Sequence, residues 1–173
     1  MLVQATLDGD QAAFGSLVDQ YEKKLYNAAY RITGSREDAM DATQAAFVKA
    51  YEKLHTFDFA HRFFSWIYRI ALNEALSMVR RRRQVTDLDS RIPDSTASPE
   101  KTASGKETGR LIQEVLMNIK PDHRVVVVLR YFEGLSYFEM GEVLGIPTKT
   151  VKSRLFSARQ ELRTALLDRG VSR

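Results

Sequence analysis

Six aromatic rings crowd into residues 57–68, beside two arginines. Aromatic faces next to cations suit unpaired nucleic-acid bases, because a base stacked on a ring gains about 1–3 kcal/mol and can be held in a pocket once it leaves a duplex. Filling a hydrophobic core is the alternative role, and we expect it for about half of these rings. The rings are Phe57, Phe59, Phe63, Phe64, Trp66 and Tyr68, and the arginines are Arg62 and Arg69.

The segment that follows these rings extends the cationic surface. On a helix Trp66, Arg69, Asn73, Ser77 and Arg80 lie along one face. An aromatic ring, two cations and an amide are therefore expected to point outward together. This combination suits single-stranded nucleic acid better than a paired duplex.

A pair of short helices is predicted in residues 136–162. Ser136 and Glu139 have the spacing of a capping box, Gly145 ends the first helix, and a new helix begins near Thr148. Gly141 has no side chain at the expected crossing point, which permits the close approach of a helix-turn-helix. The pattern therefore predicts a helix-turn-helix.

The second helix of this pair has the residue types of a DNA-reading helix. Its apolar residues Val151, Leu155, Ala158 and Leu162 recur at steps of four, three and four and are expected to face inward. Short hydroxyls and long cations remain exposed, and these can reach base edges and phosphates in a major groove. An ordinary surface helix is the alternative. The exposed residues are Lys149, Lys152, Ser153, Arg154, Ser157 and Arg159.

Catalysis finds little support in the sequence. The chain has no phosphate-binding Walker loop, no GxSxG or HExxH motif and no cysteine. Asp38 and Asp41 lie three residues apart on a predicted helix and could ligate a metal, yet no third ligand is apparent. The three histidines, at positions 55, 61 and 123, do not form a cluster. We therefore expect no enzyme activity, no metal site and no cofactor.

The elements that carry these residues are predicted to be helical throughout. Apolar residues recur at three- and four-residue steps from Asp10 to Ile32, a second helix starts at Ser35, and a third runs from about Ser65 to Arg83. The run VVVVLRYF from Val125 has the propensity of a strand, but its helical neighbours favour a helix. The prediction is an all-α fold.

A change of composition divides the chain into two helical domains. Residues 84–109 are rich in Ser, Thr, Pro, Gly and charge, which is typical of a flexible linker. We therefore expect domains at 1–83 and 110–173, the latter opening with one apolar helical face that includes Leu111, Val115 and Ile119.

Charge separates these segments more clearly than the total of +4 suggests. Residues 1–58 carry a net charge of −3, residues 59–83 of +5, residues 84–109 of −2 and residues 110–173 of +4. Two separate basic blocks are typical of a polyanion-binding protein, although a solvated charged face explains many single blocks. No apolar run approaches the roughly 20 residues that cross a bilayer, which argues against membrane insertion. The absence of cysteine and of a secretory signal suits the cytoplasm.

Four segments in order resemble the extracytoplasmic-function sigma factors, which belong to the sigma-70 family of bacterial RNA polymerase. GDQAAFGSLVDQY resembles the opening of the family, and SREDAMDATQAAFVKAYEKL resembles its polymerase-binding helix in region 2. FFSWIYRIALNEALSMVRRRR resembles the promoter-melting helix, and GLSYFEMGEVLGIPTKTVKSRLFSARQELR resembles region 4. The resemblance covers nearly the whole chain. It implies that residues 1–83 form region 2 and residues 110–173 form region 4.

The resemblance implies three binding surfaces. Met40 and Ala45 depart from the family, which usually has acids there, so the polymerase-binding helix is less negative than usual. Polymerase binding is expected at Asp38, Asp41, Gln44 and Phe47. The minus-10 promoter element is expected at Phe57, Phe59, His61, Arg62, Phe63, Phe64, Trp66, Arg69, Asn73 and Arg80, and the minus-35 element at Lys149, Thr150, Lys152, Ser153, Arg154, Phe156 and Ser157.

By this resemblance the expected partners are core RNA polymerase, promoter DNA and an inhibitory anti-sigma factor. Binding energy would shift the promoter from closed to open while catalysis stays in the polymerase. A helix-turn-helix repressor or activator of duplex DNA is the alternative, but it leaves the aromatic segment unexplained. A small recombinase is more distant, because it needs a catalytic constellation that the chain does not offer.

Overall fold

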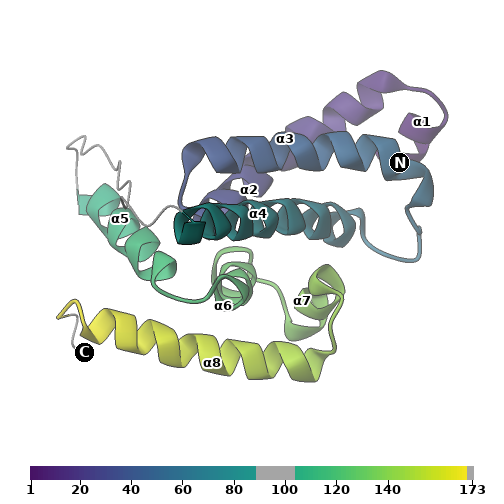
Figure 1. Ribbon diagram of the computed structural model, residues 1–173. Helices are drawn as coiled ribbons and strands as arrows, with labels where there is room; N and C mark the ends of the chain where they lie inside the picture. The colour runs from purple at the N-terminus through teal and green to yellow at the C-terminus, as the bar shows by residue number, and fades with distance from the viewer. Residues whose placement is uncertain (89–103, 171–173) are drawn as a thin grey trace.

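A computed structural model describes residues 1–88 and 104–170, and only the backbone of 86–88 and 104–106 (Figure 1). All regular secondary structure in these residues is helical, which confirms the predicted all-α class. Helices α2, α3 and α4 form one bundle, α6 and α7 lie against it, and α8 packs on the other side of α6 and α7. The elements are α1 (Leu2–Leu7), α2 (Gln11–Thr33), α3 (Arg36–Lys53), η1 (Leu54–Thr56), α4 (Phe63–Leu88), α5 (Ser104–Met117), α6 (Pro121–Val127), η2 (Val128–Phe132), α7 (Tyr137–Leu144) and α8 (Thr148–Leu167).

The first bundle follows the sequence pattern closely. The Asp10 side chain accepts hydrogen bonds from the backbone N–H groups of Ala12 and Ala13, so it caps α2 at its start. Gly34 ends the helix with a φ of 72°, a left-handed conformation that glycine adopts without strain. Helix α3 packs against α2 and α4 through small side chains, which allow the helix axes to approach closely. These are Ala39, Ala42, Ala46 and Ala50, all fully buried.

The valine-rich run in the second half is helical, as predicted from its neighbours. Helix α6 starts with Pro121 in its first turn and continues into a π-helical turn, η2. Residues 125–129 are all buried, because this segment packs against α8 on one side and against the first bundle on the other. Burial on several faces requires a continuous apolar run, and this explains the strand-like composition.

Helices α7 and α8 form the predicted helix-turn-helix. Ser136 and Glu139 make both hydrogen bonds of a capping box at the start of α7, and Gly145 ends the helix in the left-handed conformation. Val151, Leu155 and Ala158 of α8 are buried as predicted, and Leu162 is half-buried. Helix α8 is thus fixed against α6 and α7 by its apolar face.

Replacing Gly141 by Ala is expected to destabilise the protein by about 1–3 kcal/mol. A Cβ at this position would lie 2.9 Å from the carbonyl oxygen of Ile146, which is backbone and cannot swing away. Gly15→Ala is the matched control: Gly15 is exposed within α2 and a Cβ there meets nothing within 4 Å. This control should stabilise the chain by about 0.5–1 kcal/mol through helix propensity. Urea unfolding followed by circular dichroism measures both, and equal effects would contradict the close crossing.

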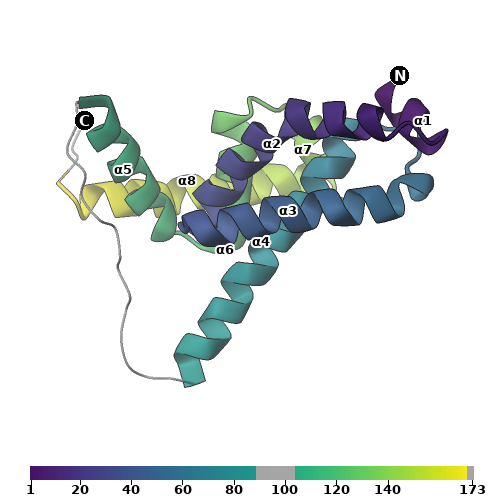
Figure 2. The same cartoon turned by 90° about the horizontal axis from the view of Figure 1, so that it is seen from above.

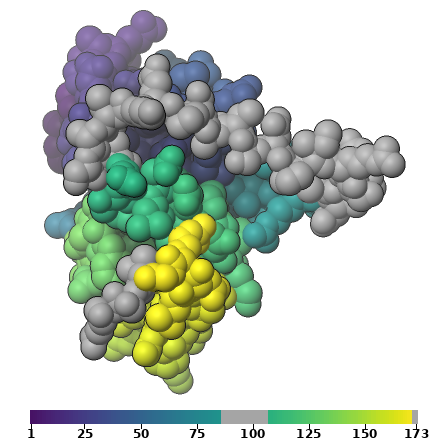
Figure 3. All heavy atoms as spheres, turned by 90° about the vertical axis from the view of Figure 1, so that its left-hand side faces the viewer, coloured from purple at the N-terminus to yellow at the C-terminus, as the bar shows by residue number. Residues whose placement is uncertain are grey.

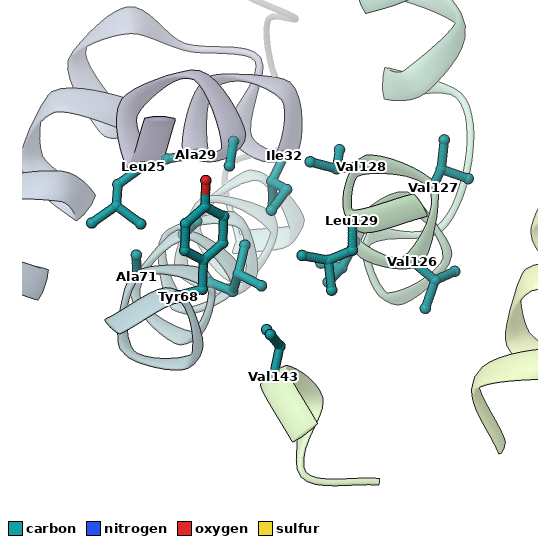
Figure 4. Packing of buried hydrophobic residues seen from close by; sticks show 14 of the residues in the cluster. Leu25, Ala29, Ile32, Tyr68, Ala71, Val126, Val127, Val128, Leu129 and Val143 are labelled. Carbon is teal, nitrogen blue, oxygen red and sulfur yellow. The ribbon is translucent and has the colours of Figure 1, made fainter. Parts of the chain in front are cut away.

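The two halves share one hydrophobic core. Tyr68 of α4 and Ile32 of α2 face Leu129 of η2 and Val143 of α7 in the centre of the molecule (Figure 4). All four side chains are fully buried. The contact continues along α5, which lies between the first bundle and α8 (Figure 3). The chain therefore folds as a closed arrangement, in which the second half covers one face of the first.

A buried arginine joins the halves at the end of α2. Arg124 of α6 is 3% exposed and donates hydrogen bonds to carbonyl groups in the last turn of α5 and just after it, at Leu116 (2.8 Å), Met117 (3.3 Å) and Ile119 (3.1 Å). It also donates to the carbonyl of Ile32 in α2. Burial is the main reason that the pKa of Arg124 is lowered to about 10, so it remains charged at neutral pH.

The ends of the predicted linker are helical. Helix α4 continues to Leu88 and projects away from the bundle (Figure 2), and α5 begins at Ser104. Residues 89–103 of the predicted linker lie outside the described residues, and the domain boundaries at 83 and 110 stay a prediction. In the described part of the chain, no helix is long and apolar enough to cross a membrane.

Candidate nucleic-acid interface

The aromatic rings after η1 and in the first turns of α4 differ in exposure, from fully buried to about half exposed. Phe57 is buried and its ring lies 5.2 Å from Phe59, 5.7 Å from Phe63 and 5.5 Å from Trp66, measured between ring centroids. Phe59 is 48% exposed, whereas Phe63, Phe64 and Trp66 are half-buried. Phe57 and Tyr68 are core residues. Filling the core was the alternative role expected for about half of the rings. The structure leaves Phe59 as the most exposed ring of the cluster.

The cations beside these rings contact the second half of the chain. Arg62 pairs with Glu139 of α7 at 2.7 Å, and Nδ1 of His61 lies 3.6 Å from the carboxylate of Glu142. Arg69 donates to the carbonyl groups of Glu142 and of Val143 (3.1 Å), in the last turn of α7. The carbonyls of a last helical turn have no partner within the helix and favour a nearby cation. Three predicted minus-10 residues are thus bound to α7.

Two further predicted minus-10 residues are exposed on the same side of α4. Asn73 is exposed, and Arg80 is exposed with its guanidinium 4.0 Å from the carboxylate of Asp122. The expected face of Trp66, Arg69, Asn73 and Arg80 therefore exists, but Trp66 turns partly into the core, where it packs against Phe57 and Phe63.

The predicted polymerase-binding residues lie along α3. Asp41, Gln44 and Phe47 line a groove of about 980 Å³ between α2 and α3, and Asp38 lies nearby in the first turn, paired with Arg82 of α4. Asp41 and Gln44 are exposed, whereas Phe47 is 9% exposed and forms part of the floor. Three of the four residues thus share one concave surface.

Exposed apolar residues in this groove were missed by the sequence analysis. Met40, Val48 and Tyr51 of α3 are each more than half exposed, and Phe14 and Val18 of α2 face them. The signal was a second apolar stripe at positions 40, 47, 48 and 51, beside the alanine stripe that forms the core. An exposed apolar groove on a charged surface marks a site of protein contact.

The predicted minus-35 residues lie on α8. Lys149, Lys152, Ser153 and Phe156 are exposed, and Phe156 is 64% exposed although it is apolar. Thr150, Arg154 and Ser157 are half-buried beside them. The residues therefore form one arc on the surface of α8, opposite its buried face.

Tyrosines of the neighbouring elements contact the cations of α8. The ammonium of Lys152 lies 6.0 Å from the ring centre of Tyr137, and Nε of Arg159 donates a hydrogen bond of 2.9 Å to the hydroxyl of Tyr131. This hydrogen bond is the main reason that the pKa of Arg159 is raised. Tyr131 and Tyr137 were not predicted as site residues, because only the tertiary fold brings them beside α8.

Metal binding finds no support in the part of the chain that the structure describes. No group of three or more His, Asp or Glu side chains lies close enough together to hold an ion there. Asp38, one of the two carboxylates considered for this role, pairs with Arg82. The candidate nucleic-acid-binding residues that the structure describes thus offer cations, hydroxyl groups and aromatic rings.

Comparisons with known proteins match both halves of the chain. The profile of Sigma-70 region 2 matches residues 17–85, and that of Sigma-70, region 4 matches residues 109–162. The ECF RNA polymerase sigma factor SigW of Bacillus subtilis is 36% identical over 172 residues, which cover 92% of each chain.

Two solved structures share the whole arrangement. CnrH, solved in complex with the cytosolic domain of CnrY, is 30% identical with a TM-score of 0.74, and the match covers 99% of this chain and 97% of that one. The sigma factor RpoE, solved with the anti-sigma factor NepR from Bartonella quintana, is 25% identical with a TM-score of 0.73, over 92% and 98% of the two chains. The two matched regions, the relatives and the helical fold agree: this chain belongs to the extracytoplasmic-function sigma factors of bacterial RNA polymerase, within the sigma-70 family.

Proposed function

We propose that this sigma factor binds core RNA polymerase through the groove between α2 and α3, the minus-10 element through the start of α4, and the minus-35 element through α8. The observation that carries this proposal is the pairing of two different basic surfaces in one chain. One surface has aromatic rings beside cations and suits unpaired bases, and the other is a helix-turn-helix that suits a duplex. A duplex-binding repressor needs only the second.

The division into residues 1–83, 84–109 and 110–173 is part of this proposal. Region 2 would then hold the polymerase and minus-10 surfaces, and region 4 the minus-35 surface. The chain itself would make and break no covalent bond, because it would act through binding energy alone. It would act in the cytoplasm, where the polymerase works. We expect neither a metal nor a cofactor.

An anti-sigma factor is the second proposed partner. The solved relatives CnrH and RpoE were each captured with another protein, named in the case of RpoE as an anti-sigma factor. The groove between α2 and α3 exposes apolar side chains in the free chain. A protein that covers this groove would compete directly with polymerase for the same residues.

Transcription from a pool of random promoters tests the proposed function. Core polymerase with the purified chain is expected to produce transcripts whose templates share two conserved blocks, one near minus-10 and one near minus-35. Core polymerase alone is the control. If the chain added no transcripts yet still bound duplex DNA, the repressor alternative would replace this proposal.

Replacing Arg154 by Ala is expected to weaken promoter binding by about 1–3 kcal/mol and to relax base preference at one minus-35 position. Arg154 is one of the proposed minus-35 residues of α8, and an arginine guanidinium can donate two hydrogen bonds to one guanine. Binding of the polymerase complex to promoters with single minus-35 substitutions measures the effect. Arg163→Ala, at an exposed position further along α8, is the matched control. A uniform loss across all sequences would instead assign Arg154 to a phosphate.

A further inference from the structure

A small second core lies beneath the loop that carries Phe59. We call residues 57–62, between η1 and α4, the Phe59 loop. Four buried side chains form this core: Val3 of α1, Leu17 of α2, Leu54 of η1 and Phe57 of the loop itself. The first residue of the Phe59 loop is therefore anchored in a core to which α1 contributes.

Helix α1 is fixed to the first bundle. It contacts both α2 and η1, at the end of the bundle where α3 leads toward the Phe59 loop (Figure 1). The turn from α1 into α2 is closed by hydrogen bonds, and the backbone N–H of Asp10 donates to the carbonyl of Ala5 at 2.9 Å. Val3 is the buried residue of this helix and is 3% exposed. Helix α1 therefore supports the loop through Val3.

A second support lies within the Phe59 loop. The carboxylate of Asp58 accepts a hydrogen bond of 2.8 Å from the backbone N–H of Ala60. The backbone carbonyl of Asp58 accepts another, of 3.0 Å, from the N–H of His61. An aspartate side chain that accepts from the backbone two residues on stabilises a tight turn. Phe59 is enclosed by this turn, and Asp58 is not among the proposed DNA-binding residues.

Phe59 depends on both supports. Its ring is 48% exposed and lies 5.2 Å from the buried ring of Phe57, with the two planes at 67°. A ring can stack on an unpaired base only at a suitable place and angle, and a loop that is ordered beforehand does not have to be ordered on binding. Resting on the proposed function, we infer that Val3 and the side chain of Asp58 are positioning residues, which hold Phe59 ready to stack on an unpaired minus-10 base.

Two substitutions at position 58 separate the turn from the charge. Asp58→Ala and Asp58→Asn both remove one negative charge, but only asparagine keeps a side-chain oxygen that can accept from Ala60. The probe is a labelled single-stranded oligonucleotide whose minus-10 block comes from templates that the promoter pool selects. Fluorescence anisotropy follows its titration with the complex of core polymerase and the full chain. We expect Asp58→Ala to bind about 3–10-fold more weakly than Asp58→Asn, as one lost hydrogen bond predicts. Equal affinity would overturn the inference.

A pair of substitutions in α1 tests the support from the second core. Val3→Ala removes two methyl groups from the core that holds Phe57, whereas Leu2→Ala shortens a side chain that is 38% exposed on the same helix. We expect Val3→Ala to weaken oligonucleotide binding by about 2–5-fold and Leu2→Ala to leave it nearly unchanged. A residue that only stabilises the fold would lower the free energy of unfolding without changing the affinity of the folded chain. Unchanged affinity of the folded Val3→Ala variant would contradict the role of α1.

Removing the ring shows whether the supports act through Phe59. In the Phe59→Ala background, the difference between alanine and asparagine at position 58 should disappear, because no ring remains to be positioned. A difference that persists would mean that Asp58 acts through another residue, and the inference would be wrong. An original chain that yields no transcripts from the promoter pool would contradict the proposed function, which the comparison at position 58 does not test.

Discussion

The Arg124→Met variant is expected to lose about 3 kcal/mol of unfolding free energy, the largest effect of any single substitution proposed for this chain. Arg124 donates to four carbonyl groups, three at or just after the end of α5 and one in α2, and three of these four hydrogen bonds are buried. Methionine fills a similar volume but donates no hydrogen bond. These carbonyls would therefore each lose a donor in a largely buried environment, and this costs more than the loss of the cation.

Urea unfolding followed by far-ultraviolet circular dichroism measures this loss. Arg163→Met is the matched control, because the same substitution at an exposed position of α8 should change stability by less than about 0.5 kcal/mol. Arg124→Lys should lie between the two, since an ammonium keeps the charge but cannot span the same set of acceptors. Equal stability of Arg124→Met and the original chain would mean that other donors or water replace the guanidinium.

Replacing Val48 by Asp is expected to reduce affinity for core RNA polymerase at least about 30-fold, or roughly 2 kcal/mol. Val48 is 54% exposed in the apolar groove, so a carboxylate there disfavours burial under a partner without disturbing the core of the bundle. Fluorescence anisotropy of a labelled chain titrated with core polymerase measures the affinity.

Val85→Asp provides the matched control for this experiment. Val85 is 63% exposed on α4, away from the groove, so the same chemical change should leave polymerase affinity nearly intact. Both variants should retain the helical circular dichroism signal of the original chain. Equal loss in both variants, or no loss in Val48→Asp, would place the polymerase contact elsewhere on the surface.

Two kinds of contact join the two halves of the chain. The buried core between Tyr68, Ile32, Leu129 and Val143 holds the halves together. The contacts that the start of α4 makes with α7 are instead exposed ion pairs and a helix-end cap. Exposed ion pairs contribute little individually and weaken with salt.

Much of the local structure was readable from the sequence. Ser35 and Ser136 begin their helices as predicted, and the predicted break at Gly145 ends α7. These signals are reliable because a cap satisfies backbone groups within a few residues of itself, whatever the rest of the chain does. The resemblance to the sigma-70 family was likewise carried by contiguous segments.

The features that the sequence did not reveal all depend on distant residues. Tyr131 contacts Arg159, Gln113 caps α2, and α7 pairs with His61 and Arg62, although each pair is far apart in the chain. Helical periodicity says which face of a helix is apolar, but not which other face it meets. The amino-acid sequence by itself determined the helices, their caps and the candidate binding residues. Only tertiary packing decided that α7 meets the start of α4, because that contact depends on the fit of two whole surfaces.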